Sequence, residues 1–385
     1  MSPLLLGFSI IVNEHDLAKR SSTKTNIKSL LNKMVYMEGG TFIMGIFPDS
    51  RIRMTESDST LFSPDMPKRT NVDPYYISAT EVTNGEWREF YQDKVIDLGE
   101  VTAKRKYFPD TSLWVTEFPY SYNKPMAEHY FSSPKFNDYP VVGITWDQAN
   151  EYCLWKSDKL KALLDKKGIQ SSIKFRLPTE IEWEYAAIKK EKKTKYTNNS
   201  AYPWSEENGF GQINDLTNIG QVHDINKVIL KQYDDDGCLY TCKVASYPPN
   251  NKGMYDMGGN VSEWTNDQGY VSIHDFKNEV HKKLESLSEI ENEIQKLQKK
   301  LDARDKVEQM FLEWLTHDRI VFRNNNLKVC KGGSWANGMI YTKTASRQGI
   351  NKDSPSSKLG FRIAISNVNQ DVVKYFPKKN WKPRK

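Results

Sequence analysis

Three stretches of this sequence carry the same helix-start signal, and they constrain its fold more than any other feature. Each places Thr three positions before Glu or Gln, so the two side chains can satisfy each other's free backbone donors at a helix N-terminus. The stretches are TNGEWREFY from Thr83, TWDQANEYCLWKS from Thr145 and TEIEWEYAA from Thr179. Apolar residues follow at helical spacing and predict one buried face per helix: Trp87, Phe90 and Tyr91; Trp146, Ala149 and Cys153; Trp183 and Ala187.

Short strands are expected between these helices. MVYMEGGTFIMG, from residue 34, predicts two strands about the Gly39-Gly40 turn, and VDPYYISATEV predicts another. Long segments rich in Tyr, Pro and Asn separate the elements, so we expect short helices and sparse regular structure. A fold of this kind needs additional stabilising links, which favours bound metal ions.

Residues 276–315 differ in character, since they contain neither Gly nor Pro. Apolar residues repeat there at spacings of three and four, as in the seam of a coiled coil, for about two heptads. We interpret residues 276–319 as a helical insertion that forms either an interface or a helix packed on its own domain. The seam residues, which are our candidate interaction residues, are Leu287, Ile290, Ile294, Leu297 and Leu301.

Charge and histidine content argue against two classes of function. The net charge is only +6 over 385 residues, and no stripe of Lys and Arg with interleaved aromatics is present, so nucleic acid binding is not expected. The six histidines form no HExxH motif and no paired His–Cys spacing, which argues against a zinc site. The Cys238 and Cys242 thiols in CLYTC are either bridged, in an oxidising compartment, or free.

The N-terminal stretch LLLGFSIIV, residues 4–12, is too short to span a bilayer. It has two interpretations, an eroded export signal or an ordinary N-terminal element. No basic segment precedes it, no small-residue cleavage site follows it, and no Cys is available there for lipid attachment.

The loop YDMGGNVSEW, residues 255–264, combines two acids with two glycines. Asp256 and Glu263 offer carboxylates, and the glycines allow a sharp turn that can aim backbone carbonyls at the same point. Such oxygen ligands suit Ca²⁺. The alternative is a glycine turn followed by an N-capped helix.

Eight blocks, in order along the chain, resemble one family. They are MVYMEGGTFIMG, ATEVTNGEWREFY, YPVVGITWDQANEYCLW, FRLPTEIEWEYAA, YPW, YDMGGNVSEW, KGGSW and SPSSKLGFRIA. Together they resemble the formylglycine-generating enzyme (sulfatase-modifying factor) domain over residues 34–269 and 326–366. The resemblance implies an α+β fold, similar to C-type lectins, with little regular structure. It would comprise residues 34–275 and 320–366, with residues 1–33 as an N-terminal segment and 367–385 as a flexible basic tail.

The segment FPDTSLWVTEFPYSYNKPMAEHYFSSPKFNDYPVVGITW is similar to the gliding-motility lipoproteins K and J of Bacteroidetes. That resemblance implies a subunit of the type IX secretion or gliding apparatus at the periplasmic face of the outer membrane. Expected partners are further copies of the chain and an N-type periplasmic subunit. The absence of an N-terminal lipid-acceptor Cys leaves membrane association open.

The family carries two structural calcium sites, and the resemblance assigns oxygen ligands for both. Asp256 stands where the family usually has Asn, and its extra negative charge suits a calcium ligand. The expected ligands are Asn218, Ile219, Asp236 and Cys238 in the first site, and Asp256, Gly259, Val261 and Glu263 in the second.

Active members of the family hold Cu(I) with two cysteine thiolates, which are soft ligands that other side chains do not replace easily. Counting back from Gly360, those positions fall here on Met339 and Thr344, and Cys330 lies too early in the chain to substitute. We therefore expect no copper and no catalytic residue. Another branch of the fold uses an H-x3-H-x-E iron site, which this sequence lacks. Glu180 and Glu184 share a helix face but are better explained as acids favoured by the helix dipole.

The sequence thus predicts a catalytically inert member of this fold that acts as a structural subunit. The alternatives are a formylglycine-type oxidoreductase with altered chemistry, and a lectin-like module that binds ligands through exposed aromatics such as Trp114 or Tyr122.

Overall fold

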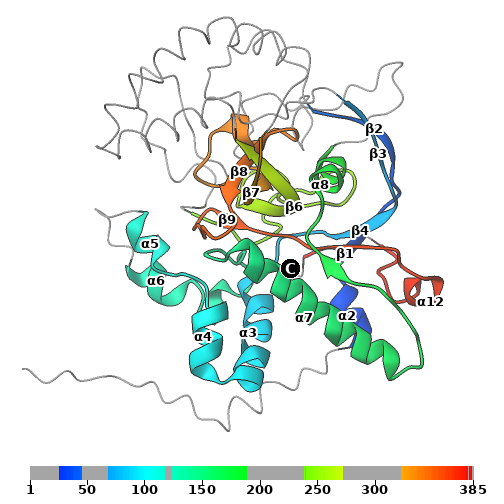
Figure 1. The fold of residues 1–385 in the computed structure, drawn as a ribbon, viewed down its shortest axis with the longest axis horizontal. Helices are drawn as coiled ribbons and strands as arrows, with labels where there is room; N and C mark the ends of the chain where they lie inside the picture. The colour runs from blue at the N-terminus through cyan, green and yellow to red at the C-terminus, as the bar shows by residue number, and fades with distance from the viewer. Residues whose placement is uncertain are drawn as a thin grey trace, which may run out of the picture.

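The computed structural model describes residues 26–45, 68–117, 124–188, 238, 240–271, 322–379 and 381–383. Within these ranges helices and short sheets are mixed, so the α+β class is confirmed (Figure 1). The helices are α2 (Ile27–Leu31), α3 (Asn84–Leu98), α4 (Glu100–Tyr107), α5 (Leu113–Thr116), α6 (Lys124–His129), α7 (Trp146–Asp165), α8 (Glu180–Ala187) and α12 (Gln370–Val373), with 3-10 turns η2 (Pro134–Phe136) and η5 (Met339–Thr342).

Ten strands in the described ranges form three sheets, ordered β1-β4-β10-β5, β2-β3 and β8-β7-β6-β9. Both strands predicted about the Gly39-Gly40 turn are present, but they pair with different partners: β1 with β4, and β2 with β3. The strands are β1 (Met34–Met37), β2 (Gly40–Met44), β3 (Lys68–Val72), β4 (Tyr75–Ser78), β5 (Phe175–Arg176), β6 (Ser262–Val271), β7 (Phe322–Lys331), β8 (Arg347–Asn351), β9 (Leu359–Gly360) and β10 (Ala364–Ser366).

The β6–β9 pairing brings distant segments together. The short strand β9 lies parallel to β6, with Ser262 opposite Leu359 and Glu263 opposite Gly360. The chain then passes directly into β10, which lies between β4 and β5 in the other four-stranded sheet. Residues 361–363 therefore connect the two larger sheets, and the contacts of these residues help to hold the sheets together.

All three predicted capping boxes are present, at Thr83, Thr145 and Thr179, each with reciprocal side-chain and backbone hydrogen bonds. The expectation that these helices are short was wrong for α7, which runs for 20 residues. No Gly or Pro interrupts its sequence, and its buried stripe continues past Cys153 to Leu160 and Leu164.

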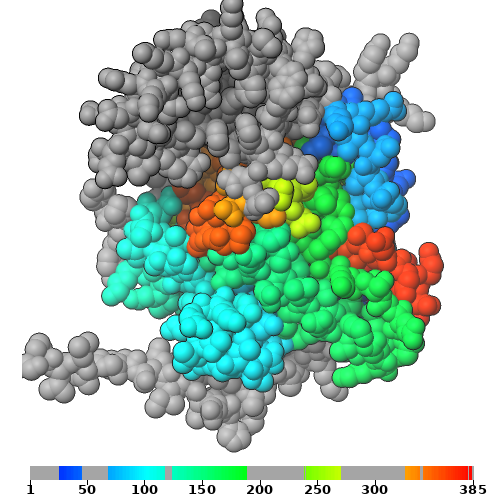
Figure 2. Space-filling model, viewed as in Figure 1, coloured from blue at the N-terminus to red at the C-terminus, as the bar shows by residue number. Residues whose placement is uncertain are grey.

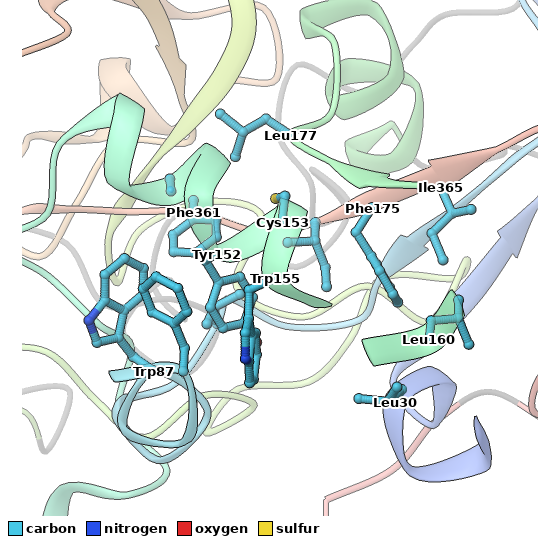
Figure 3. Close-up of a cluster of buried hydrophobic side chains, with 14 of the residues drawn as sticks. Leu30, Trp87, Tyr152, Cys153, Trp155, Leu160, Phe175, Leu177, Phe361 and Ile365 are labelled. Carbon is cyan, nitrogen blue, oxygen red and sulfur yellow. The ribbon is translucent and has the colours of Figure 1, made fainter. Parts of the chain in front are cut away.

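In the main core, the inward faces of α2, α3 and α7 pack against β5 and the 359–365 segment (Figure 3). Trp87 is fully buried and stacks on Tyr152 with 5.7 Å between ring centroids and an interplanar angle of 9°. Phe361 meets both rings edge-on. Of the aromatic residues predicted to face inward, Trp87 and Phe90 are buried in this core, Tyr91 and Trp146 are partly buried against it, and Trp183 lies in a second core cluster.

Both ends of the described chain are part of this body. Residues 26–31, which the sequence placed in an N-terminal segment, form α2 and bury Ile27, Leu30 and Leu31 in the core. The expectation of a flexible C-terminal tail was wrong for residues 370–379 and 381, because Val372 and Phe376 are buried and Trp381 packs edge-on against Tyr255. In Figure 2 this segment, coloured red, lies against the domain.

The predicted helical insertion, residues 276–319, lies outside the described residues, with its seam residues Leu287, Ile290, Ile294, Leu297 and Leu301. Among the described helices, none combines the length and apolar character needed to cross a bilayer.

Candidate functional site

The loop 255–264 leads into a strand and not into the N-capped helix that was one interpretation of its sequence. It ends in β6, and three of its residues adopt positive φ: Asp256, Gly259 and Asn260. The Gly259 N–H donates to the Gly332 carbonyl at 2.9 Å, and the Asn260 carbonyl accepts from the Trp335 N–H at 2.9 Å. The loop is thus bonded to the KGGSW segment, far along the chain.

A buried ion pair lies where the loop meets β6. Arg362 donates to both oxygens of Glu263, Nε to Oε2 and Nη2 to Oε1, each at 2.6 Å, and both side chains have no exposed surface. Glu263 Oε2 also accepts the indole N–H of Trp183 at 2.7 Å. The remaining Arg362 donors reach the carbonyls of Ser78, Ala79 and Tyr255 at 2.9–3.3 Å.

Two further carboxylates lie beside this pair. Glu81 Oε1 accepts the Asn260 amide at 2.9 Å, and Asp256 Oδ2 accepts the Ala245 N–H at 2.6 Å. Their second oxygens, Glu81 Oε2 and Asp256 Oδ1, are buried and accept no hydrogen bond from another described residue, and the two carboxyls interact with each other. Burial raises the pKa of Asp256 to about 6, and burial together with the neighbouring acids Asp256 and Glu263 raises the pKa of Glu81.

These contacts bear on the predicted second calcium site. The buried Oδ1 of Asp256, which accepts from no described donor, suits a cation ligand. Both oxygens of Glu263, however, already accept hydrogen bonds from Arg362, and Oε2 also accepts one from Trp183. The four calcium ligands expected from the sequence also include the carbonyls of Gly259 and Val261. In this arrangement the four together therefore do not fit a calcium site. Sequence reasoning missed Glu81, because a single acid in ATEVT carries no local signal of burial.

The first predicted calcium site cannot be placed, because Asn218, Ile219 and Asp236 lie outside the described residues. Its fourth member, Cys238, forms a disulfide with Cys242. Of the two states that the sequence left open for these cysteines, bridged or free, the structure has the bridged one. The Cys242 N–H donates to Asn260 Oδ1 at 2.9 Å. The bridged segment is therefore bonded to the same loop that carries Asp256.

The positions of the family's two redox cysteines lie in and after η5. Met339 begins this 3-10 turn, and Thr344 follows it with 3% of its surface exposed. The remaining cysteines, Cys153 and Cys330, are buried free thiols, and burial raises the pKa of Cys153 to about 12 and that of Cys330 well above its usual value. Neither thiol is a ready source of thiolate at neutral pH.

Glu180 and Glu184 have a role beyond the helix dipole. Both are buried on α8, and Lys331 on β7 lies 3.5 Å from Glu180 Oε1 and 3.2 Å from Glu184 Oε2. Arg347 lies 3.3 Å from Glu180 Oε2, and the Gly45 N–H donates to Glu184 Oε1 at 2.8 Å. The acids therefore join α8 to β7, β8 and the end of β2, a structural task that their spacing alone did not indicate.

The aromatic residues proposed for ligand contact do not form an exposed platform. Trp114 is only 1% exposed and packs against Tyr130, Tyr240 and Trp335. The prediction that Trp114 is an exposed aromatic available to a ligand was therefore wrong. Tyr122 lies outside the described residues.

Comparison with known proteins agrees with the resemblance to the formylglycine-generating enzyme domain. The chain is 26% identical over 276 residues to the formylglycine-generating enzyme of Mus musculus, which covers 65% of this chain and 64% of that protein. It is 30% identical over 251 residues to inactive C-alpha-formylglycine-generating enzyme 2 of Mus musculus, which covers 60% of this chain and 68% of that protein. The match to the active enzyme thus spans less than two thirds of that relative's length.

Solved structures with similar folds include Treponema denticola variable protein 1, with a TM-score of 0.46 and 19% identity over 86% of this chain and 94% of that one. PvdO from Pseudomonas aeruginosa has a TM-score of 0.44 and 19% identity, over 89% of this chain and 97% of that one. The model of the sulfatase-modifying factor enzyme 1-like domain matches residues 19–367. The chain therefore belongs to the sulfatase-modifying factor enzyme 1-like (formylglycine-generating enzyme) family.

Proposed function

We propose that this protein is a non-catalytic member of its family and serves as a structural subunit of a larger assembly. The state of its cysteines carries the proposal. The sequence contains four, of which two form the Cys238–Cys242 disulfide and the other two are buried free thiols. Thr344, where active members have a redox thiol, cannot supply a thiolate.

The relatives of this chain, one named as an enzyme and one named as inactive, are compatible with a non-catalytic role. The chain resembles a formylglycine-generating enzyme and also an inactive C-alpha-formylglycine-generating enzyme. At least one relative of this chain is therefore named as inactive. A fold kept without its chemistry is available for binding and assembly.

The assembly that we propose is the type IX secretion or gliding apparatus, with the chain as its K-type subunit facing the periplasm. The motifs in residues 108–146 support this choice, and the disulfide is compatible with an oxidising compartment. Further copies of the chain and an N-type periplasmic subunit would be its partners. Calcium, bound through the first predicted site, remains part of the proposal.

The helical insertion 276–319 is the proposed interface. Ile294→Asp places a charge in the middle of its apolar seam, so it should abolish assembly while the domain stays folded. A matched Lys299→Asp change, away from the seam positions, should leave assembly intact. Loss of folding by Ile294→Asp, or unchanged assembly, would remove the insertion from the proposal.

A peptide-oxidation assay separates the proposed role from an oxidase with altered chemistry. The purified chain is supplied with Cu(I), oxygen and a cysteine-containing sulfatase peptide, and aldehyde formation is followed by mass spectrometry. We expect no turnover. Turnover that Met339→Ala abolishes would overturn the proposal and indicate an unusual thioether-based oxidase.

A further inference from the structure

A groove of about 960 Å³ lies between α2, the start of α3, the middle of α7, the loop 243–246 and the C-terminal residues 381–383. Ligand pockets in proteins commonly measure about 300–1,000 Å³, so the groove can hold a sizeable ligand. Its lining does not include Met339, Thr344, Glu263 or Arg362. It is therefore distinct from the Glu263–Arg362 pair and from the positions of the redox cysteines, although Ala245 of its lining donates its N–H to Asp256.

The buried charge in the groove is positive. Lys33 and Lys156 share a single carboxylate, Glu86, with Nζ–oxygen distances of 2.9 and 3.7 Å. Lys156 is 7% exposed, and among described residues it donates a hydrogen bond to the Tyr152 hydroxyl at 3.3 Å. Because an ammonium carries three donors, Lys156 retains donors for a further acceptor.

Two more cations of the groove lack a carboxylate partner among the described residues. Arg88 donates through Nη1 to the carbonyls of Phe131 and Ser133, while its Nη2 has no partner. Lys243 is exposed and forms no ion pair with a described acid. The remaining acids of the lining, Glu89 and Asp138, are exposed, as Lys243 is, so water screens all three charges. Glu89 also lies near enough to Lys156 to interact with it, so the four cations of the lining exceed its three acids by one charge.

The uncharged lining suits a polypeptide. Side-chain amides of Asn32, Gln92 and Asn137 face the groove and can both donate to and accept from a peptide main chain. Trp381 contributes an aromatic wall, held edge-on against Tyr255. A small carboxylate alone would use neither the amides nor the volume.

We propose that this groove binds an acidic peptide segment of a partner protein, whose carboxylates are attracted by the cations of the lining, Lys156, Arg88 and Lys243. The inference deepens the proposed assembly role. It rests on that role, because assembly requires the ligand to be part of a protein.

The test uses two fluorescein-labelled hexapeptides, all-Glu and all-Gln, whose binding to the full chain is followed by fluorescence anisotropy at low and physiological salt. We expect the Glu peptide to bind at least about tenfold more tightly. Arg88→Gln and Lys243→Gln should each weaken it about fivefold, since each removes one charge from the lining. The control is Lys106→Gln, the same change at an exposed α4 residue outside the groove, which should leave affinity unchanged.

Equal affinity for the two peptides, or equal weakening by Lys106→Gln, would overturn the proposal, because only non-specific attraction would then be measured. Binding of glycans but not peptides would overturn it as well. The outcome is separable from the assembly role: partners that co-purify equally with wild type and Arg88→Gln contradict the groove alone. Peptide binding by a chain that recovers no partner supports the groove and contradicts assembly.

Discussion

The guanidinium of Arg362 and the carboxylate of Glu263 form a bidentate pair, with two hydrogen bonds of 2.6 Å between side chains that have no exposed surface. Arg362 also donates to carbonyls of Ser78 and Tyr255, and so reaches β4 and the loop before β6. The sequence led us to expect that a metal ion stabilises this loop. In the described arrangement an internal cation, Arg362, joins the segments there.

Arg362→Met should destabilise the fold by about 3–5 kcal/mol, because it leaves the Glu263 carboxylate buried and unpaired. Urea denaturation followed by circular dichroism measures the change. The double variant Arg362→Met with Glu263→Leu should recover part of the loss, since it removes both charges. As a control, Lys161→Met breaks an exposed pair with Asp165 and should change stability little. An Arg362→Met variant as stable as this control would show that the pair contributes nothing.

Glu263→Gln should lower the melting temperature by the same amount in calcium and in a chelator, because the partners of Glu263 are Arg362 and Trp183. Any calcium-dependent rise in melting temperature from this loop should instead require Asp256, whose Oδ1 accepts a hydrogen bond from no described donor. Thermal unfolding of Glu263→Gln and Asp256→Ala, with and without calcium, tests this. If Glu263→Gln alone removes a calcium effect, Glu263 is a ligand and the pair with Arg362 gives way to the metal.

Acid should destabilise the chain partly through Glu86. Burial alone would raise the pKa of Glu86, but the Lys33 and Lys156 ammoniums lower it from 4.5 to about 2. A carboxyl with a lowered pKa in the folded state stabilises the protein above its unfolded pKa, and that contribution is lost as the pH falls from 4.5 to about 2.

Glu86→Gln should therefore be less stable than wild type at neutral pH, and the difference should shrink over that acid range. Denaturation midpoints between neutral pH and pH 2 provide the comparison. Glu128→Gln, at an exposed pair with Lys124, serves as the matched control with little effect. A constant difference between Glu86→Gln and wild type at every pH would rule out the lowered pKa.

Restoring the two thiols should create a Cu(I) site. Met339→Cys with Thr344→Cys supplies the soft ligand pair that active members use, and competition with a chromogenic Cu(I) chelator measures binding. We expect the wild type to compete weakly and the double variant to compete strongly. Equal competition by both proteins would mean that Met339 and Thr344 are not the positions of the missing cysteines.

The Cys238–Cys242 disulfide should leave two thiols available after denaturation without reductant, those of Cys153 and Cys330. Alkylation of the unfolded chain followed by peptide mass spectrometry counts them. Replacing both bridged cysteines by Ser should cost about 2 kcal/mol, the entropy of a very short closed loop. Labelling of all four cysteines in the unreduced protein would contradict the bridge.

Local signals in the sequence were sufficient to predict where the three capped helices begin, because a capping box is complete within four residues. Thr83 with Glu86 and Thr179 with Glu182 needed no knowledge of the rest of the chain. The same signals say nothing about where a helix ends, which explains the error for α7. Its last turns are kept by burial of Leu160 and Leu164 in the core.

The arrangement of the site could not be read in the same way. Glu263 and Arg362 are 99 residues apart in the chain, and Lys331 meets Glu184 across 147 residues. The pairing of β6 with β9 brings Glu263 beside the segment that carries Arg362, and the packing of α8 against β7 brings Glu184 to Lys331. A lone carboxylate in a sequence looks the same whether its partner is calcium, arginine or water, so Glu263 was assigned to calcium on resemblance.

The measurement that most directly tests the central claim is a cross-linked pull-down of the tagged chain from native envelope fractions, read by mass spectrometry. A structural subunit should be recovered in multiple copies, cross-linked to itself and to secretion or gliding subunits. Recovery of the chain without partners, or together with sulfatase-like proteins, would contradict an assembly role and return attention to an enzyme or a ligand-binding module.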